Sequence, residues 1–411
     1  MQTNLTDSIR DTAKGQEADR ILRTCVHCGF CNATCPTYQL LGNELDGPRG
    51  RIYLIKQTLE GNVPSAHTQL HLDRCLTCRA CETTCPSGVE YGRLLEIGRA
   101  QVEQAVPRSW RQRLLRGALL RTLPYRLRFT FLLRAGQWLR PLLPGRIRRL
   151  VPRRVHGRPA PSNVHPRRVI VPPGCVQPAL APQIDQATVR VLDGVGIQAL
   201  QPDSGCCGAV NLHMADEDQA LEFMRRNIDV WWPHIEAGAE AIVVTATGCG
   251  VTVRDYGRLL AHDPDYSVKA ERVSALARDL SELLEDVDRN KLQRNARAPR
   301  RIAFHAPCTL QHGMKLSGRA EALLVRLGFE LTPVPDAHLC CGSAGTYSIL
   351  QPRLSQQLGD DKVQALESGA PELIATANIG CLLELRKRAG VPVVHWIELL
   401  DPAPDVAPAG S

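Results

Sequence analysis

Two runs of four cysteines stand in the first hundred residues of the chain. CVHCGFCNATCP and CLTCRACETTCP both have the spacing C-x2-C-x2-C-x3-C-P, and the second run begins 50 residues after the first. Three thiolates on one tight loop can bind one iron–sulfur cluster, while the fourth, placed before a proline, usually binds the other cluster. We therefore predict two [4Fe–4S] clusters, one bound by Cys25, Cys28, Cys31 and Cys85 and the second by Cys75, Cys78, Cys81 and Cys35.

Two alternatives accompany this prediction. Cys35 and Cys85 could each bind the cluster of their own loop, because spacing alone does not exclude local ligation. Structural zinc sites also use four cysteines, but they favour two C-x2-C pairs separated by a long loop. The doubled spacing therefore favours iron–sulfur over zinc.

Eight further cysteines form a second duplicated pattern. Each set has one cysteine, then a CCG triplet, then a GC pair, and the equivalent positions are offset by 132–134 residues. The sets are Cys175, Cys206, Cys207 and Cys249, and Cys308, Cys340, Cys341 and Cys381. A disulfide within a CC pair would be strained, because adjacent Cα atoms lie about 3.8 Å apart, below the roughly 4.4–6.8 Å usual for disulfides. We favour metal ligation; thiol redox chemistry and a structural role stay open.

The elements around the cysteines indicate two kinds of fold. EADRILRTC, RIYLIKQTLEG and YGRLLEIGRAQVEQA have helical spacing of apolar residues around the first two runs. In the second half, RVIVPPGC and RIAFHAPC read as short strands that end at a cysteine, as do EAIVVTATGC and ELIATANIGC. Strands that alternate with helices indicate parallel sheets, whose sites lie at the carboxyl ends of the strands. Gly208 and Gly342 after the CC pairs should adopt positive φ.

A basic segment separates the two halves. Residues 108–158 contain 15 arginines and no acidic residue, although the whole chain has a net charge of only +8. Leucines, Trp110, Phe129, Phe131 and Trp138 lie among these arginines. This pattern fits basic amphipathic helices on an anionic membrane surface, and it also fits docking to an acidic partner subunit. We expect no nucleic-acid binding, because no nucleic-acid motif accompanies the charge.

The expected location is the cytoplasm, with peripheral attachment to the inner membrane as a further option. The N-terminus has no apolar signal core. The chain also has no apolar run of 18 residues, so we expect no membrane-spanning helix. Sixteen cysteines are best explained by metal or catalysis in a reducing compartment.

The CCG triplets resemble the cysteine-rich domains of the heterodisulfide reductase catalytic-subunit family. Together with the paired cysteine runs, with GPRGRIYLIK at 47–56 and with TCPSGVEYG at 84–92, they make almost the whole chain similar to the iron–sulfur subunits of bacterial glycolate oxidases. The fullest CCG motif ends in C-x-x-C, whereas this chain has Thr252 and Glu384 at the final position. This departure argues against a cluster with five thiolates, and His305, His338 and His395 are candidate additional ligands.

The resemblance implies an α+β multidomain fold, an N-terminal all-α ferredoxin-type domain followed by two duplicated α/β CCG domains. We divide the chain into the helical domain (1–105), the basic connecting segment (106–165), the first CCG domain (166–290), the second CCG domain (300–400) and a flexible tail (401–411). The resemblance also allows further iron–sulfur clusters in the CCG repeats.

The resemblance also implies electron transfer within a glycolate dehydrogenase complex. FAD and the site that oxidises glycolate to glyoxylate would lie on a partner subunit, a second flavoprotein-like subunit would join the complex, and a membrane quinone or another acceptor would receive the electrons. No G-x-G-x-x-G follows a strand, so no FAD or NAD motif is expected here. The alternatives are an iron–sulfur subunit for lactate or glycerol 3-phosphate dehydrogenase, a thiol/disulfide catalyst like heterodisulfide reductase, and a zinc-stapled scaffold.

Overall fold

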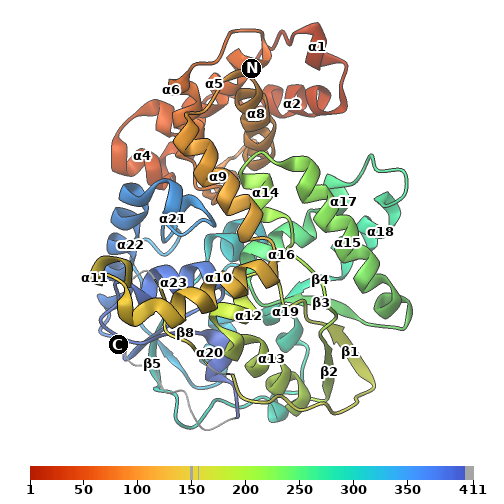
Figure 1. The fold of residues 1–411 in the computed structure, drawn as a ribbon, viewed down its shortest axis with the longest axis vertical. Coiled ribbons are helices and arrows are strands. Elements are labelled where there is room, and N and C mark those ends of the chain that lie inside the picture. The colour runs from red at the N-terminus through yellow and green to blue at the C-terminus, as the bar shows by residue number, and fades with distance from the viewer. Residues whose placement is uncertain (149–150, 156, 403–411) are drawn as a thin grey trace.

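A computed structural model describes residues 1–148, 151–155 and 157–402. It shows a helical N-terminal unit above two sheet-containing units, with the basic helices crossing in front of them (Figure 1). This arrangement confirms the expected α+β fold. The expected flexible tail lies outside the described residues except for 401–402. Among the described residues, no helix is both long and apolar enough to cross a membrane.

The N-terminal unit is built from short helices around the two cysteine loops. The three helices expected from sequence are confirmed at α2 (Ala13–Thr24), α5 (Pro48–Leu59) and α8 (Tyr91–Ala105). The others are α1 (Asp7–Arg10), α3 (Phe30–Ala33), α4 (Pro36–Leu41), η1 (Glu44–Asp46), α6 (Ala66–Asp73) and α7 (Ala80–Thr84). Leucines and isoleucines of α2, α5 and α8 form their common core.

Both cysteine loops have the same backbone conformation. The residues before and after the second cysteine have positive φ in each loop: His27 and Gly29 in the first, Thr77 and Arg79 in the second. Non-glycine residues rarely adopt this conformation. Because the same two positions carry it 50 residues apart, the cysteine spacing imposes one loop geometry in both places.

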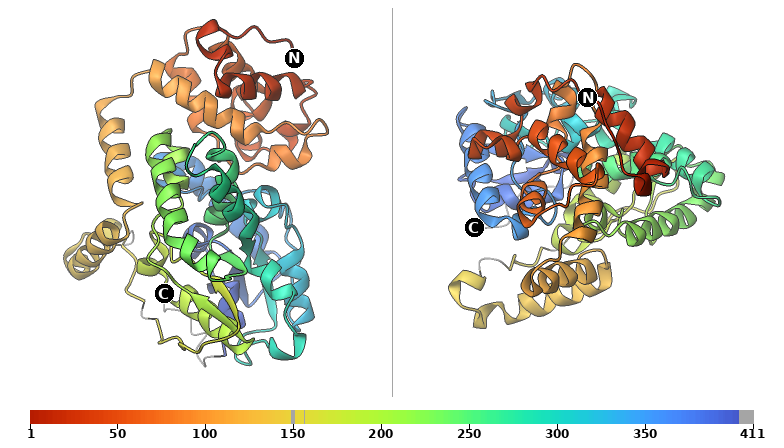
Figure 2. Two further views of the ribbon diagram at one scale, coloured as in Figure 1. Left: turned by 90° about the vertical axis from the view of Figure 1, so that its right-hand side faces the viewer. Right: turned by 90° about the horizontal axis from the view of Figure 1, so that it is seen from above.

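The basic segment is helical and lies on the outside of the molecule (Figure 2). It contains α9 (Trp110–Thr122), α10 (Arg126–Leu139), η2 (Arg140–Leu142) and α11 (Gly145–Arg148). The side chain of Arg116 on α9 is buried and donates a hydrogen bond to the carbonyl of Met214 over 3.0 Å. Every residue of α10 is at least partly exposed. Tyr125, directly before α10, packs edge-on against Phe223 with ring centroids 5.5 Å apart. The segment is therefore attached to the body both through α9 and at the start of α10.

The first CCG repeat contains a parallel sheet with the strand order β2-β1-β3-β4. Its strands are β1 (Arg167–Ile170), β2 (Ile197–Leu200), β3 (Ala241–Val244) and β4 (Ala277–Asp279). The connecting and covering helices are α12 (Gln177–Leu180), α13 (Pro182–Gly194), α14 (Ala209–His213), α15 (Glu217–Glu236), α16 (Thr247–Arg254), α17 (Tyr256–Leu259), α18 (Ser267–Leu276) and α19 (Leu280–Glu285), with η3 (Arg289–Lys291) after them.

The second repeat has the same topology, with the order β6-β5-β7-β8. Its strands are β5 (Arg301–His305), β6 (Glu330–Leu331), β7 (Leu373–Thr376) and β8 (Val393–His395). Its other elements are the π-helix η4 (Thr309–Gly313), α20 (Arg319–Arg326), α21 (Tyr347–Leu350), α22 (Pro352–Glu367), α23 (Ile379–Arg386) and η5 (Trp396–Leu399). Sequence analysis did not predict β4 and β8, the last strand of each sheet.

The two repeats share one hydrophobic core. A single cluster of buried residues runs from Val169 and Val243 in the first sheet to Ile302 and Ile374 in the second. A hydrogen-bond contact also joins the two repeats, since Nε2 of His395 lies 3.0 Å from the carbonyl oxygen of Thr245. The repeats therefore hold their cysteine-bearing ends in a fixed mutual position.

Candidate iron–sulfur sites

The first loop receives a cysteine from the second. Cys25, Cys28, Cys31 and Cys85 all line one small pocket, together with Cys81. Burial, and then the neighbouring thiols of Cys25, Cys28 and Cys85, raises the pKa of Cys31 to about 11. Thiols raise the pKa of one another only when they lie close together. The structure thus brings Cys85 to the first loop, which is the arrangement required for crossed ligation.

The second loop receives Cys35 in the same way. Burial first, and then the nearby thiols of Cys78, Cys75 and Cys35, raises the pKa of Cys81 well above its usual value. Burial also raises the pKa of Cys75, but Arg51 and Arg99 outweigh this effect and hold it below the usual value. A cationic shell of this kind favours the thiolate, the form that binds metal.

Residues that sequence analysis did not assign surround this second set. The guanidinium of Arg51 is 1% exposed and lies 4.0 Å from Sγ of Cys35. It also donates to the hydroxyl of Thr37 over 3.1 Å, and that hydroxyl lies 3.3 Å from Sγ of Cys35. Arg51 belongs to the GPRGR stretch. Arg51 is the one charged residue among the buried positions of α5. This pattern in the sequence could have indicated its role.

The first CCG repeat gathers its four cysteines beyond the carboxyl ends of β1, β2 and β3. Hydrogen bonding to Cys175 and Cys207 is the main cause that raises the pKa of Cys206, while the neighbouring Cys206 and Cys249 thiols are the main causes that lower the pKa of Cys207. Asn227 donates to the carbonyl of Cys206 over 2.8 Å, and the Tyr256 hydroxyl donates to that of Cys207 over 3.0 Å. The CC pair is thus clamped through its backbone.

The second CCG repeat gathers its own four cysteines. The Sγ atoms of Cys308 and Cys340 are 3.9 Å apart. Hydrogen bonding to Cys340 lowers the pKa of Cys341, but hydrogen bonding to Cys381 and burial outweigh this effect and raise that pKa well above its usual value. A buried lysine, Lys362, lies near this set; burial lowers its pKa, while the thiols of Cys340 and Cys341 oppose that shift. The expected positive φ is found at both glycines, 91° at Gly208 and 80° at Gly342.

The candidate additional ligands differ in their surroundings. Both ring nitrogens of His395 have partners, the carbonyl of Thr245 and the N–H of Ile397. The side chain of His338 is half-buried. The backbone carbonyl of His338 lies 3.0 Å from Nε2 of His312. By contrast, a ring nitrogen of His305 and the Sγ atoms of Cys341 and Cys381 all lie within 4.8 Å of one another.

The two positions that replace the last cysteine of the full motif are engaged elsewhere. The Thr252 hydroxyl donates to the carbonyl of Gly248 over 3.3 Å. Glu384 is buried and accepts from Ser355, Lys387 and Arg388 at 2.6–3.1 Å. Their side chains satisfy neighbouring groups, so the final position of the motif supplies no obvious fifth ligand.

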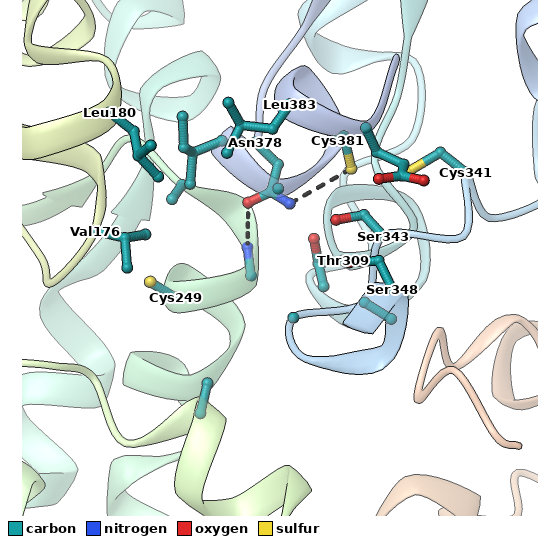
Figure 3. A pocket seen from close by; sticks show the side chains of 18 of the residues that line it. Val176, Leu180, Cys249, Thr309, Cys341, Ser343, Ser348, Asn378, Cys381 and Leu383 are labelled. Carbon is teal, nitrogen blue, oxygen red and sulfur yellow. Dashed lines mark hydrogen bonds between the residues drawn. The ribbon is translucent and has the colours of Figure 1, made fainter. Parts of the chain in front are cut away.

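All eight CCG cysteines line one cavity of about 1490 Å³ between the repeats. Figure 3 shows Cys249 on one side of it and Cys341 and Cys381 on the other. Asn378 connects the two sides: its Oδ1 accepts from the N–H of Gly248 over 3.4 Å, and its Nδ2 donates to Sγ of Cys381 over 3.4 Å. The duplicated pattern in the sequence therefore forms two facing sets of thiols.

Known protein families match both the N-terminal cysteine loops and the two CCG repeats. Residues 21–89 match the 4Fe-4S dicluster domain, and residues 169–254 and 302–386 each match the cysteine-rich domain CCG. The chain is 55% identical over 405 residues to the glycolate oxidase iron-sulfur subunit of Escherichia coli (strain K12), across 98% of this chain and 99% of that protein. The chain belongs to the glycolate oxidase iron-sulfur subunit family.

More distant relatives extend the comparison. The probable glycolate oxidase iron-sulfur subunit of Bacillus subtilis (strain 168) is 31% identical over 419 residues, 92% of this chain and 93% of that protein. Lactate utilization protein A of Geobacillus thermodenitrificans is 28% identical over 228 residues, 53% of this chain and 92% of that protein. These similarities support iron–sulfur cofactors and an electron-transfer role within an oxidoreductase complex.

The thiols of this family member fit that role by their chemistry and their order in space. Four sulfur donors converge at each of four places, which suits iron–sulfur ligation. The second N-terminal set adjoins the second CCG repeat, because Leu76 and Cys78 pack in one cluster with Cys308 and Cys340. The hydroxyl of Thr83 lies 2.9 Å from Nδ1 of His312 and joins the same two units. Cys28 of the first set is exposed.

Proposed function

We propose that this chain is the iron–sulfur electron-transfer subunit of a cytoplasmic glycolate dehydrogenase. The similarity over the full length to the Escherichia coli subunit carries this proposal. A partner subunit with FAD would oxidise glycolate to glyoxylate, a second flavoprotein-like subunit would complete the complex, and a membrane quinone or another acceptor would take the electrons. Bound iron–sulfur clusters supply one-electron transfer.

We further propose two [4Fe–4S] clusters with crossed ligation in the N-terminal unit, and iron–sulfur ligation by the CCG thiols. The grouping of Cys85 with the first loop and of Cys35 with the second supports the first part. The gathering of thiols in each repeat supports the second part. The protein would hold these groups in a row from the exposed Cys28, through the buried second set, to the cavity between the repeats.

The outer end of this row has features of a contact surface for the partner. Val26 and Phe30 flank Cys28 and are 67% and 61% exposed. Apolar side chains exposed beside a redox site are typical of places where proteins dock. Electrons from a partner flavin would need such a close approach, so we assign the FAD subunit to this end.

The substrate assignment can be tested by reconstitution. The chain would be produced together with candidate flavoprotein subunits and co-purified anaerobically, and dye reduction would be measured with glycolate, lactate and glycerol 3-phosphate. We expect glycolate to be the preferred substrate, with activity that requires this chain. A preference for lactate would favour the alternative supported by the lactate utilization relatives, and dye reduction that survives without this chain would contradict its role.

The basic helices carry a second proposal, attachment to an anionic membrane surface. On α10, Leu127, Phe131 and Trp138 are 80%, 73% and 80% exposed, and Leu142 on η2 is 82% exposed. Arginines stand between them in sequence. Exposed aromatic and leucine side chains beside arginines favour the interface of an anionic bilayer. An acidic partner subunit would be matched by the charge but not by the scattered exposed apolar side chains.

A further inference from the structure

The second CCG repeat differs from the first at two positions beside its cysteines. His305 is the last residue of β5. By the 133-residue offset from Cys175 to Cys308, it is equivalent to Pro172 of the first repeat. Thr376 is the last residue of β7. By the 132-residue offset from Cys249 to Cys381, it is equivalent to Val244. The second repeat therefore carries a polar pair where the first carries an apolar pair.

The polar pair is buried and in direct contact. His305 and Thr376 are partners in the register of β5 and β7, and they are 2% and 0% exposed. Nδ1 of His305 lies 3.0 Å from Oγ1 of Thr376. This bond orients the imidazole ring. A second polar contact of this kind commonly orients histidines that bind metal.

The other ring nitrogen of His305, Nε2, is in a different situation. Among the residues that the structure describes, none hydrogen-bonds Nε2 of His305, although this atom is buried. A buried polar atom without a partner is unfavourable, and its presence in a native site calls for an explanation. A metal ion is one such partner, since a neutral imidazole nitrogen is a good ligand.

The surroundings of the ring supply the rest of a metal site. The Sγ atoms of Cys341 and Cys381 and a ring nitrogen of His305 lie within 4.8 Å of one another. We propose that His305 is a nitrogen ligand, through Nε2, of an iron–sulfur centre held by Cys308, Cys340, Cys341 and Cys381. This inference rests on the proposed ligation of iron by the CCG thiols.

The neighbouring alternatives are already occupied. Glu384 is bound by Lys387 and Arg388, and His395 has partners on both nitrogens. His305 would thus replace the fifth cysteine that the full motif places after the GC pair, and it would do so from a different strand. The first repeat, with Pro172 at this position, would hold an all-thiolate centre.

The mixed ligand set has an electrochemical consequence. An imidazole is neutral, whereas a thiolate adds a negative charge to the centre. Replacement of thiolate by histidine raises the reduction potential of iron–sulfur centres. The centre of the second repeat should therefore have a higher midpoint potential than one with cysteine at position 305, which makes the two facing centres unequal.

Pulsed EPR on the full chain, reconstituted anaerobically and examined in oxidised and reduced states, tests the proposal without any mutation. We expect hyperfine coupling from a coordinated nitrogen, which changes from the 14N to the 15N pattern when the protein contains 15N-histidine. Absence of histidine nitrogen coupling in both states would overturn the proposal. Zinc instead of iron in the second repeat would overturn it as well.

Variants separate His305 from the other histidines. His305→Cys should keep the iron content, lose the nitrogen coupling and lower the midpoint potential of one centre. His395→Gln, which alters a buried histidine of the same sheet, should keep the coupling. Coupling that survives in His305→Cys would refute ligation by His305.

A third variant tests the underlying assignment. Cys341→Ser should lose iron relative to the wild type. An unchanged iron content there would contradict ligation by the CCG thiols themselves. Loss of iron in Cys341→Ser together with unchanged spectra in His305→Cys would contradict only the role of His305.

Discussion

The Tyr91 hydroxyl donates a hydrogen bond to Sγ of Cys75 over 3.6 Å. Tyr91 is the first residue of α8 and is 4% exposed. The helix that follows the second loop therefore reaches back to the first cysteine of that loop. Hydrogen bonds to sulfur are one of the means by which a protein sets the potential of an iron–sulfur cluster.

Tyr91→Phe removes this donor without a change in apolar volume. A hydrogen bond to sulfur stabilises the more negative, reduced state, so its loss should lower the midpoint potential of one N-terminal cluster. We expect a shift of up to roughly 60 mV, which corresponds to about 1.4 kcal/mol for one electron. Redox titration followed by EPR measures it. Tyr53→Phe, at a 47% exposed tyrosine, is the control, and equal potentials in both variants would disprove the effect.

Crossed ligation predicts which serine variants behave alike. Cys28→Ser and Cys85→Ser should remove the same EPR signal, because both thiols belong to the first pocket. The single variants Cys35→Ser and Cys78→Ser should each remove the other signal. Iron content and EPR of the anaerobic proteins provide the measurement. If Cys35→Ser instead removes the signal that Cys28→Ser removes, ligation is local to each loop.

Gly342→Ala should destabilise the second CCG repeat. The residue has a φ of 80°, and a Cβ atom there would lie 2.6 Å from the carbonyl oxygen of Ser355. Strain and the close contact together should cost about 1–3 kcal/mol, seen as a lower midpoint of thermal unfolding. Gly42→Ala is the matched control, since its φ is 62° but no atom lies within 4 Å of the added Cβ. A loss no larger than that of the control would exclude the steric contribution.

The membrane proposal predicts a salt-sensitive attachment that depends on apolar side chains. Serine at Leu127, Phe131 and Trp138 should weaken binding to vesicles that contain phosphatidylglycerol, with the unfolding temperature unchanged because these side chains are exposed. Binding of the wild type should fall as salt rises, since charges are screened over about 8 Å at physiological ionic strength. Vesicle co-sedimentation measures both effects. Val268→Ser, at a 78% exposed valine, should bind like the wild type; equal binding by the triple variant would argue against attachment through α10.

Asp185 predicts a pH dependence of stability. Burial, opposed by hydrogen bonds from Gln177 and Thr245, raises the pKa of Asp185 to about 7. Between about pH 4 and pH 7 the folded state keeps a proton that the unfolded state releases, so stability falls as pH rises through this window. The slope approaches about 1.4 kcal/mol per pH unit. Beyond about pH 7 this contribution levels off.

Asp185→Asn removes the titrating group and should flatten this dependence. Urea unfolding between pH 5.5 and pH 8 measures the slope in the variant and the wild type. Asp361→Asn alters an exposed carboxylate and should leave the slope unchanged. A wild-type stability that rises from pH 5.5 to pH 7, with the variant following it, would contradict the raised pKa.

The sequence alone determined the kinds of unit and their chemistry. The C-x2-C-x2-C-x3-C-P runs, the repeated CCG pattern, and the helices at α2, α5 and α8 depend on neighbouring residues and on local periodicity, which are visible in one dimension. The duplicated parallel sheets followed from strands that alternate with helices. The short strands β4 and β8 escaped because three residues carry too little periodicity, and Ala277–Asp279 directly continues the helix α18.

The tertiary structure decided which of these residues meet. The placement of Cys85 beside the first loop, the burial of Arg51 near Cys35, and the contact of His305 with Thr376 each join positions far apart in the chain. The facing of all eight CCG thiols into one cavity depends on how the two sheets pack through their shared core. No local pattern records that packing, because it results from the complementary shapes of surfaces that form only after the elements have folded.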